Sequence, residues 1–188
     1  MTALIAAPVI PAAAQDVRPA DMERLAYLTE HFGTAMRQAM EGGAPEDVEA
    51  LRQALAGSPD GRADPAGEWE CRTIKVGGTS ALVVYQPFRC RITPDGPGAW
   101  RIEKLTGSQR LSGRIEATQG GTVYIGVGFV GDAPATDYAG LPGGQEPVEP
   151  GQTHAQVGLL EMAGPDRGRI LLPAPVLESR FDILALTR

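Results

Sequence analysis

Hydrophobic residues near the N-terminus recur with helical spacing. Gly42 and Gly43 end a first predicted helix over residues 21–40, and a second helix begins at Pro45 and ends before Gly57. Because neither helix is stable alone, we expect the two to form a hairpin that packs on another part of the chain. The apolar face of the first helix consists of residues three or four positions apart, namely Met22, Leu25, Leu28, Phe32, Met36 and Met40.

Beyond Gly67 the period changes to that of β-strands. Eight short runs rich in Val, Ile, Thr and aromatic residues are separated by Gly, Pro or Asp, at 68–76, 82–93, 99–106, 109–117, 121–130, 154–163, 168–173 and 178–187. No helical pattern lies between them, so we expect an antiparallel sheet. Eight strands with mostly short connections fit an up-and-down barrel or a sandwich.

The strand at 121–130 has two distinct faces. One face is apolar, and we expect it to point into the core: Val123, Ile125, Val127 and Phe129. The opposite face carries Gly126 and Gly128, which allow close approach of another backbone. We therefore expect the helical hairpin to pack on this glycine face, outside the core.

The first fourteen residues are uncharged and apolar and end in three alanines. This pattern is typical of a secretory signal with an A-x-A cleavage site, although a basic n-region is missing. The alternative is an apolar terminal segment, and fourteen residues are too few for a membrane span. We expect a periplasmic or secreted protein with a signal-like segment at 1–14, a helical hairpin and linker at 15–66, and a β-domain at 67–188.

Composition and charge exclude several classes of protein. The chain has 188 residues, 43% of them hydrophobic, and a net charge of −6, which fits one sizeable core and disfavours a nucleic-acid binder that relies on bulk charge. Two cysteines are too few for a multi-cysteine zinc site or a dense disulfide scaffold. The charge is unevenly distributed, because residues 67–114 carry a net charge of +4 and the connection 131–153 a net charge of −4.

The acidic connection 131–153 is our candidate functional loop. It is unusually long for a compact barrel, and such loops are functional or disordered. It could cover the barrel mouth, dock on the arginine-rich strands or remain solvated, whereas its acids lack the spacing of a calcium loop. Its candidate residues are Asp132, Asp137, Tyr138, Glu146 and Glu149.

No familiar catalytic constellation is present in the sequence. His31 and His154 are far apart, and we expect both on the surface or on a helix face. Residues 126–131 match G-x-G-x-x-G, but Pro and Gly follow at once, so no helix can begin there to receive a dinucleotide pyrophosphate. We expect no enzyme activity, no cofactor and no metal.

Cys71 and Cys90 lie on the first two predicted strands. A hairpin turn at residues 80–81 would place them opposite each other, where a cross-strand disulfide is natural. Residues 77–78, two glycines, are the stronger turn signal and would shift this register unless a bulge compensates. The alternatives are two buried thiols or a redox-active pair.

Two resemblances refine the expected fold. Gly67-Glu-Trp69, the eight strands and Arg180 in the last strand resemble the lipocalin and wider calycin pattern. That resemblance implies a closed barrel in which Arg180 packs over Trp69 as a barrel-end lock. Residues 67–78, 82–85, 88–92 and 180–184, with the preceding hairpin, look like an exported bacterial family of unknown function. This second resemblance supports the disulfide and export and implies no activity.

Two functional hypotheses follow from these features. The first is an exported, non-enzymatic binding protein that holds a small apolar ligand in the barrel interior or its mouth. The second is an envelope inhibitor of a protease or lysozyme that uses the loop 131–153. An open barrel pocket would favour the first hypothesis, and a filled barrel with a protruding loop the second. We expect a monomer whose partner is a small ligand or an envelope protein and not a nucleic acid.

Overall fold

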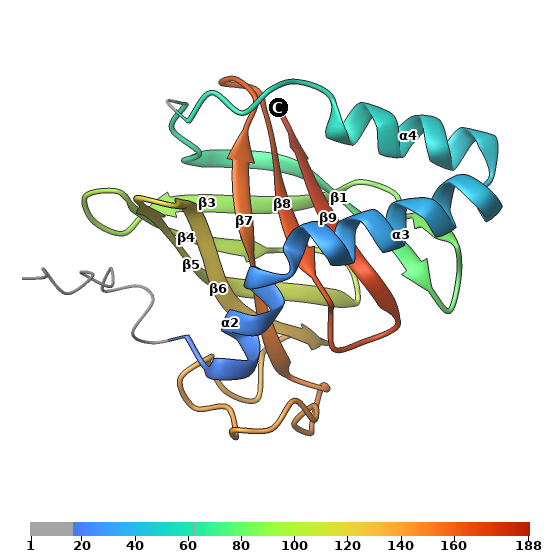
Figure 1. The fold of residues 1–188 in the computed structure, drawn as a ribbon. Coiled ribbons are helices and arrows are strands. Elements are labelled where there is room, and N and C mark those ends of the chain that lie inside the picture. Colours follow the sequence, from blue (N-terminus) through green and yellow to red (C-terminus); the bar gives the residue numbers. More distant parts are fainter. Residues whose placement is uncertain (1–16, 62) are drawn as a thin grey trace, which may run out of the picture.

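Eight antiparallel strands close into a barrel (Figure 1). The computed structural model describes residues 17–61 and 63–188, and the signal-like segment lies outside them. Sequential neighbours pair around the barrel, and pairing of the first strand with the last closes it. The barrel strands are β1 (Gly67–Gly78), β3 (Phe88–Pro94), β4 (Ala99–Lys104), β5 (Gln109–Thr118), β6 (Gly121–Val130), β7 (His154–Met162), β8 (Arg167–Pro173) and β9 (Ser179–Thr187).

The predicted strand 82–93 is divided into two strands in the structure. The short β2 (Leu82–Val84) pairs with the second half of β1, and β3 pairs with the first half. The turn between β1 and β2 lies at residues 77–81, where Gly77 N donates to Ala81 O at 2.9 Å. The turn therefore contains both the glycine pair and residues 80–81, and the two-residue turn predicted at 80–81 is wrong.

The predicted disulfide between Cys71 and Cys90 is confirmed, with Cα atoms 5.8 Å apart. The two residues are not opposite each other, because Cys90 pairs with Trp69 and Cys71 with Phe88. The disulfide therefore crosses the β1–β3 ladder diagonally and joins the two strands inside the barrel.

The inner face of β6 is the reverse of the prediction. Tyr124 is fully buried in the interior cluster, and its ring lies over the cross-strand pair Gly113 and Gly126. A Cβ at Gly126 would lie 2.6 Å from the Tyr124 hydroxyl, so this glycine makes room for the ring. The face predicted to be core, from Val123 to Phe129, points outward.

Apolar side chains from all eight strands fill the barrel interior. They form a single cluster with little exposure, closed by the Cys71–Cys90 disulfide. The other members of this cluster are Trp69, Ile92, Ile102, Leu111, Ile115, Tyr124, Leu160, Met162, Ile170, Leu172, Leu184 and Leu186.

Three helices lie against the outside of the barrel (Figure 1). The single helix predicted over 21–40 is divided at Tyr27 into α2 (Pro19–Ala26) and α3 (Leu28–Gly42), and α4 (Pro45–Leu55) follows. The apolar cluster under α3 and α4 uses the outer faces of β1, β8 and β9, not the glycine face of β6, so the predicted packing site is wrong.

Small residues and one arginine hold the helices on the barrel. Ala35 and Ala39 are fully buried against the wall, whereas Met22 and Met40, predicted for the same face, are 41% and 53% exposed. Alanine lets the backbone of α3 approach β1 closely, which long methionine side chains would prevent. At the end of α4, Arg169 donates to the carbonyl oxygens of Ala54, Ala56 and Gly57, which satisfies groups that a helix end leaves free.

The cation over the Trp69 ring is Arg188, not Arg180. The Arg188 guanidinium carbon lies 4.1 Å from the ring centroid, and its Nη1 donates to Ala66 O at 2.7 Å. Arg180 is exposed at the start of β9, next to the residue that pairs with Val76 and so at the opposite end of the barrel from Trp69. The lock predicted between Trp69 and Arg180 is therefore wrong, because Arg180 lies at the far end of β9 from this tryptophan.

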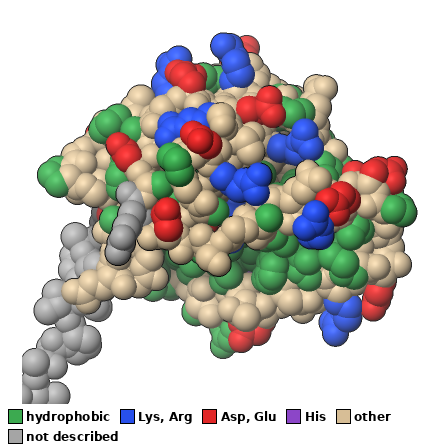
Figure 2. All heavy atoms as spheres, turned by 90° about the horizontal axis from the view of Figure 1, so that it is seen from above, with side chains coloured by type: hydrophobic (Ala, Val, Ile, Leu, Met, Phe, Trp, Pro, Cys, Tyr) green, Lys and Arg blue, Asp and Glu red, His purple; other side chains and the backbone are tan. Residues whose placement is uncertain are grey.

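The surface over α4 and the adjoining barrel end carries charges of both signs. In Figure 2, lysine and arginine side chains alternate with acidic ones, and hydrophobic side chains gather at the lower right, on the side of the helices.

Candidate functional site

The loop 131–153 folds back against the outer wall of the barrel, beside α2 (Figure 1). Leu141 packs with Val127 and Phe129 of β6 and Ala155 of β7 in a separate apolar cluster, which Tyr138 and Val148 complete. The outward apolar face of β6 is therefore buried by this loop. Because both faces of the strand are covered, alternation along it could not show which one is inside.

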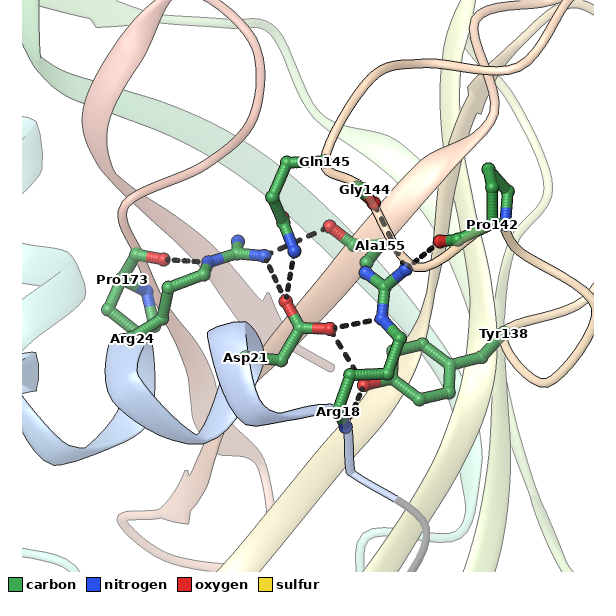
Figure 3. A network of polar contacts seen from close by, with 9 residues as sticks. All are labelled: Arg18, Asp21, Arg24, Tyr138, Pro142, Gly144, Gln145, Ala155 and Pro173. Atoms are coloured by element: carbon green, nitrogen blue, oxygen red, sulfur yellow. Dashed lines mark hydrogen bonds and ion pairs between the residues drawn. The ribbon is translucent and has the colours of Figure 1, made fainter.

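Asp21 of α2 fixes this loop through a network of polar contacts (Figure 3). The Tyr138 hydroxyl donates to Asp21 Oδ2 at 2.7 Å, and Arg18 Nε donates to the same oxygen at 2.8 Å. Arg24 Nη1 donates to Asp21 Oδ1 at 2.9 Å. Gln145 Nε2 lies 3.5 Å from that oxygen. One buried carboxylate thus joins the helix to two points of the loop.

The two arginines extend this network to main-chain oxygens. Arg18 Nη1 donates to Pro142 O at 2.7 Å, and Arg24 donates to Ala155 O and Pro173 O, each at 3.2 Å. These bonds connect α2 to the loop, to β7 and to the end of β8. The clamp, as we call Arg18, Asp21, Arg24 and Tyr138, therefore holds together four segments that are distant in the sequence.

Asp21 remains ionised inside this clamp. Burial alone would raise the pKa of Asp21, but hydrogen bonds from Tyr138 and Arg18 and the charge of Arg24 outweigh it and hold this pKa below its ordinary value. Asp21 is fully buried and Arg24 is 7% exposed. The carboxylate thus compensates charge that would otherwise be buried without a partner.

The predicted acidic residues of the loop do not converge. Asp132 pairs with Arg110 of β5 at 3.3 Å, and Asp137 accepts a hydrogen bond from Gly140 N at 2.9 Å. Glu146 and Glu149 are exposed. Among residues 17–61 and 63–188, no group of three or more His, Cys, Asp or Glu side chains is arranged to hold a metal ion.

A groove of about 520 Å³ runs between this loop and the outer wall of β4, β5 and β6. Its floor is apolar on the β6 side, and its rim carries three arginines and one aspartate, a net charge of +2. Its volume lies within the range of small-molecule sites. The lining residues are Arg18, Arg101, Ser112, Gly113, Arg114, Ile125, Gly126, Val127, Pro134, Asp137, Tyr138 and Ala139.

The barrel interior is filled except at one end. That end, which we call the polar end, contains the buried charged and polar side chains Lys75, Lys104, His154 and Asp182. The cavity there has a volume of about 30 Å³, room for about one water molecule. A ligand of the size expected from the sequence therefore has no space in this cavity.

Burial shifts the pKa values of side chains at the polar end. It raises the pKa of Asp182 to about 6 and, together with the charge of Lys75, lowers the pKa of Lys104 to about 8. Burial also lowers the pKa of His154, whose Nδ1 lies 2.7 Å from Gln152 O. The expectation that His154 lies on the surface is wrong, because it faces the barrel interior across from Gly128.

Sequence reasoning missed the clamp because its residues come from distant segments. Arg18, Asp21 and Arg24 have the three-residue spacing that places side chains on one helical face. This spacing was the one local indication of the clamp, because it places three charged side chains together at the start of the first predicted helix. Tyr138 was already a candidate residue of the loop, but it lies more than a hundred residues away, and no local pattern connects it to this helix.

Comparison with known proteins gives a family without an assigned activity. Residues 14–186 match the family described as Domain of unknown function (DUF4893), so the chain belongs to that family. The expected membership of a family of unknown function is confirmed. No curated protein and no solved structure matches the chain. In the described part of the chain, no helix is long and apolar enough to cross a membrane.

Proposed function

We propose that this member of the DUF4893 family is an exported, non-enzymatic binding protein whose ligand lies in the groove outside the barrel. The observation that carries the proposal is the contrast in volume between the groove, about 520 Å³, and the cavity inside the barrel, about 30 Å³. Concave, partly apolar sites of the larger size are typical of small-molecule binding. The proposed ligand site therefore lies on the outer wall of the barrel and not in the interior, where the sequence led us to expect it.

The clamp supports this location because it gives the groove a fixed wall. Tyr138 and Arg18 line the groove and are both bonded to the buried Asp21. A wall that is ordered before binding spares the ligand the entropic cost of ordering it. The same folded-back arrangement favours a groove over an inhibitory loop, which would have to protrude from the barrel to reach an enzyme.

Export is part of the proposal and rests on two features. The Cys71–Cys90 disulfide is of a kind that persists in oxidising compartments, and residues 1–14 have the sequence pattern of a secretory signal. We expect N-terminal sequencing of the protein from the cell envelope fraction to begin near Gln15. A protein that retains Met1 and is found in the cytoplasm would contradict export.

A fluorescent probe tests the groove directly. N-phenylnaphthylamine is uncharged and apolar, and we expect one molecule to bind the parent protein saturably. Ser112→Trp places a large ring in the groove from β5, and we expect it to weaken binding at least about tenfold. Ser58→Trp, at an exposed serine that follows α4 and is not part of the groove lining, is the matched control and should bind like the parent.

Two results would overturn the proposed site. One is a parent protein that does not bind the probe. The other is a folded Ser112→Trp variant that binds the probe as tightly as Ser58→Trp does.

A further inference from the structure

We infer that the groove selects an amphipathic anion, namely an alkyl chain that ends in an oxyanion such as a carboxylate or phosphate. This inference rests on the proposed function and adds the chemical class of its ligand. The anionic group would lie between Arg101 and Arg114, and the chain would extend over the apolar floor toward β6.

The first argument is the arrangement of the two arginines. Arg101 of β4 and Arg114 of β5 are directly opposite each other in the antiparallel ladder, and both line the groove. Like charges in this position repel each other and destabilise a sheet. A bound oxyanion would remove that repulsion, because two guanidinium groups can donate several hydrogen bonds to one anion.

The second argument is that Arg101 is available for a ligand. It is exposed, and it makes no hydrogen bond or ion pair with another residue in the described part of the chain. Arg114 is positioned by Glu116, whose Oε1 lies 3.2 Å from Arg114 Nε. In this pair, Glu116 holds the Arg114 guanidinium in place, and the Arg101 guanidinium can move toward a bound anion.

The third argument is the apolar surface that begins beside the pair. Ile125 of β6 pairs with Arg114, and Val127 pairs with Ser112, so the apolar residues lie one strand away from the guanidinium groups. Adjacent strands are about 4.8 Å apart, within reach of a single molecule. Pro134 and Ala139 of the loop add apolar surface on the other side of the groove.

Charge around the groove also favours an anion over a cation. The lining residues carry a net charge of +2, and the Asp137 carboxylate already accepts a hydrogen bond from Gly140 N. Arg18 adds a buried Nη2 with no hydrogen-bond partner among the described residues. A cationic ligand would be repelled by Arg101, because the nearby carboxylates of Glu116 and Asp21 already pair with Arg114 and Arg18.

Ligands of equal chain length and different head groups test this inference. We would measure binding of decanoate, decyl phosphate and 1-decanol to the parent protein by calorimetry. We expect at least one anion to bind about tenfold or more tightly than the alcohol, because hydrogen bonds to charged groups are strong. The difference should diminish as salt is added.

Variants then locate the effect. Arg101→Gln should remove most of the preference for anions, because Arg114 alone then faces the anionic group, and should leave alcohol binding unchanged. Arg89→Gln, an exposed arginine on the outer face of β3, is the matched control and should keep the preference for anions.

The possible results separate the two proposals. Equal binding of alcohol and anions would overturn the inference and leave the groove as a site for neutral ligands. A preference for anions that Arg101→Gln leaves undiminished would also overturn it. Absence of binding for all three compounds would contradict the proposed function itself.

Discussion

Asp21→Asn is the substitution that most sharply tests how the groove wall is held. Asparagine has nearly the same volume as aspartate, so the change removes charge without opening a cavity. It leaves Arg18 and Arg24 without the buried carboxylate that compensates them. It also weakens the bond from Tyr138, through which the loop 131–153 is attached to α2.

The expected loss of stability follows from burial. Breaking a buried ion pair by removing one partner costs about 3–5 kcal/mol, and we expect about 3 kcal/mol because the amide can still accept one hydrogen bond. For a chain of this size, that corresponds to a fall in Tm of about 6–12 °C. Because the pKa of Asp21 is held below its ordinary value, this stabilisation is complete above about pH 4 and is lost only at lower pH.

Differential scanning calorimetry at pH 7 and hydrogen exchange provide the measurements. The matched control is Glu49→Gln, which breaks another pair of residues three apart in a helix, with Arg52, but on the exposed surface. We expect the control to leave Tm unchanged, since exposed pairs contribute little. Faster exchange should be confined to α2 and the loop 131–153. A Tm for Asp21→Asn equal to that of Glu49→Gln would refute the role of the clamp.

Three further predictions concern the barrel. Asp182→Asn should stabilise the protein by up to about 3 kcal/mol at pH 8 and much less at pH 4. The reason is that the raised pKa of this buried carboxyl makes its ionisation costly as pH rises through about 6. Equal effects on urea unfolding at both pH values would contradict this. Replacing Cys71 and Cys90 by serine should cost about 3 kcal/mol in the same assay, and no loss would show that the bond constrains nothing. Arg188→Leu should lower Tm, whereas Arg180→Leu, its exposed control, should not; equal shifts would exclude the lock at Arg188.

The strands could be predicted from the sequence, but their inner and outer faces could not. Alternation and glycine or proline punctuation gave seven of the eight barrel strands within two residues at each end, whereas the predicted strand 82–93 spans both β2 and β3. On β6 the same alternation is uninformative, because the loop buries the outer face and the barrel the inner one. Only the pairing of Gly113 with Gly126 shows that these glycines accommodate Tyr124 inside the barrel.

The groove was beyond reach of sequence reasoning for a topological reason. Its lining comes from the start of α2, from three strands and from the loop, as Arg18, Arg101, Arg114, Ile125 and Tyr138 illustrate. The excess of arginine in 67–114 and the acidity of the loop were visible. Their juxtaposition depends on the order of strands around the barrel and on the clamp, which no local pattern encodes.

The central claim is tested most directly by finding which residues of the protein change their NMR signals when a ligand is added. Isoleucine δ1 methyl groups can be followed by NMR while decanoate is added, and Ile125 lines the groove whereas Ile102, Ile115 and Ile170 fill the barrel interior. We predict that the Ile125 methyl signal shifts saturably and that the three interior signals stay in place. Shifts of the interior methyl groups with Ile125 unmoved would contradict a site on the outer wall.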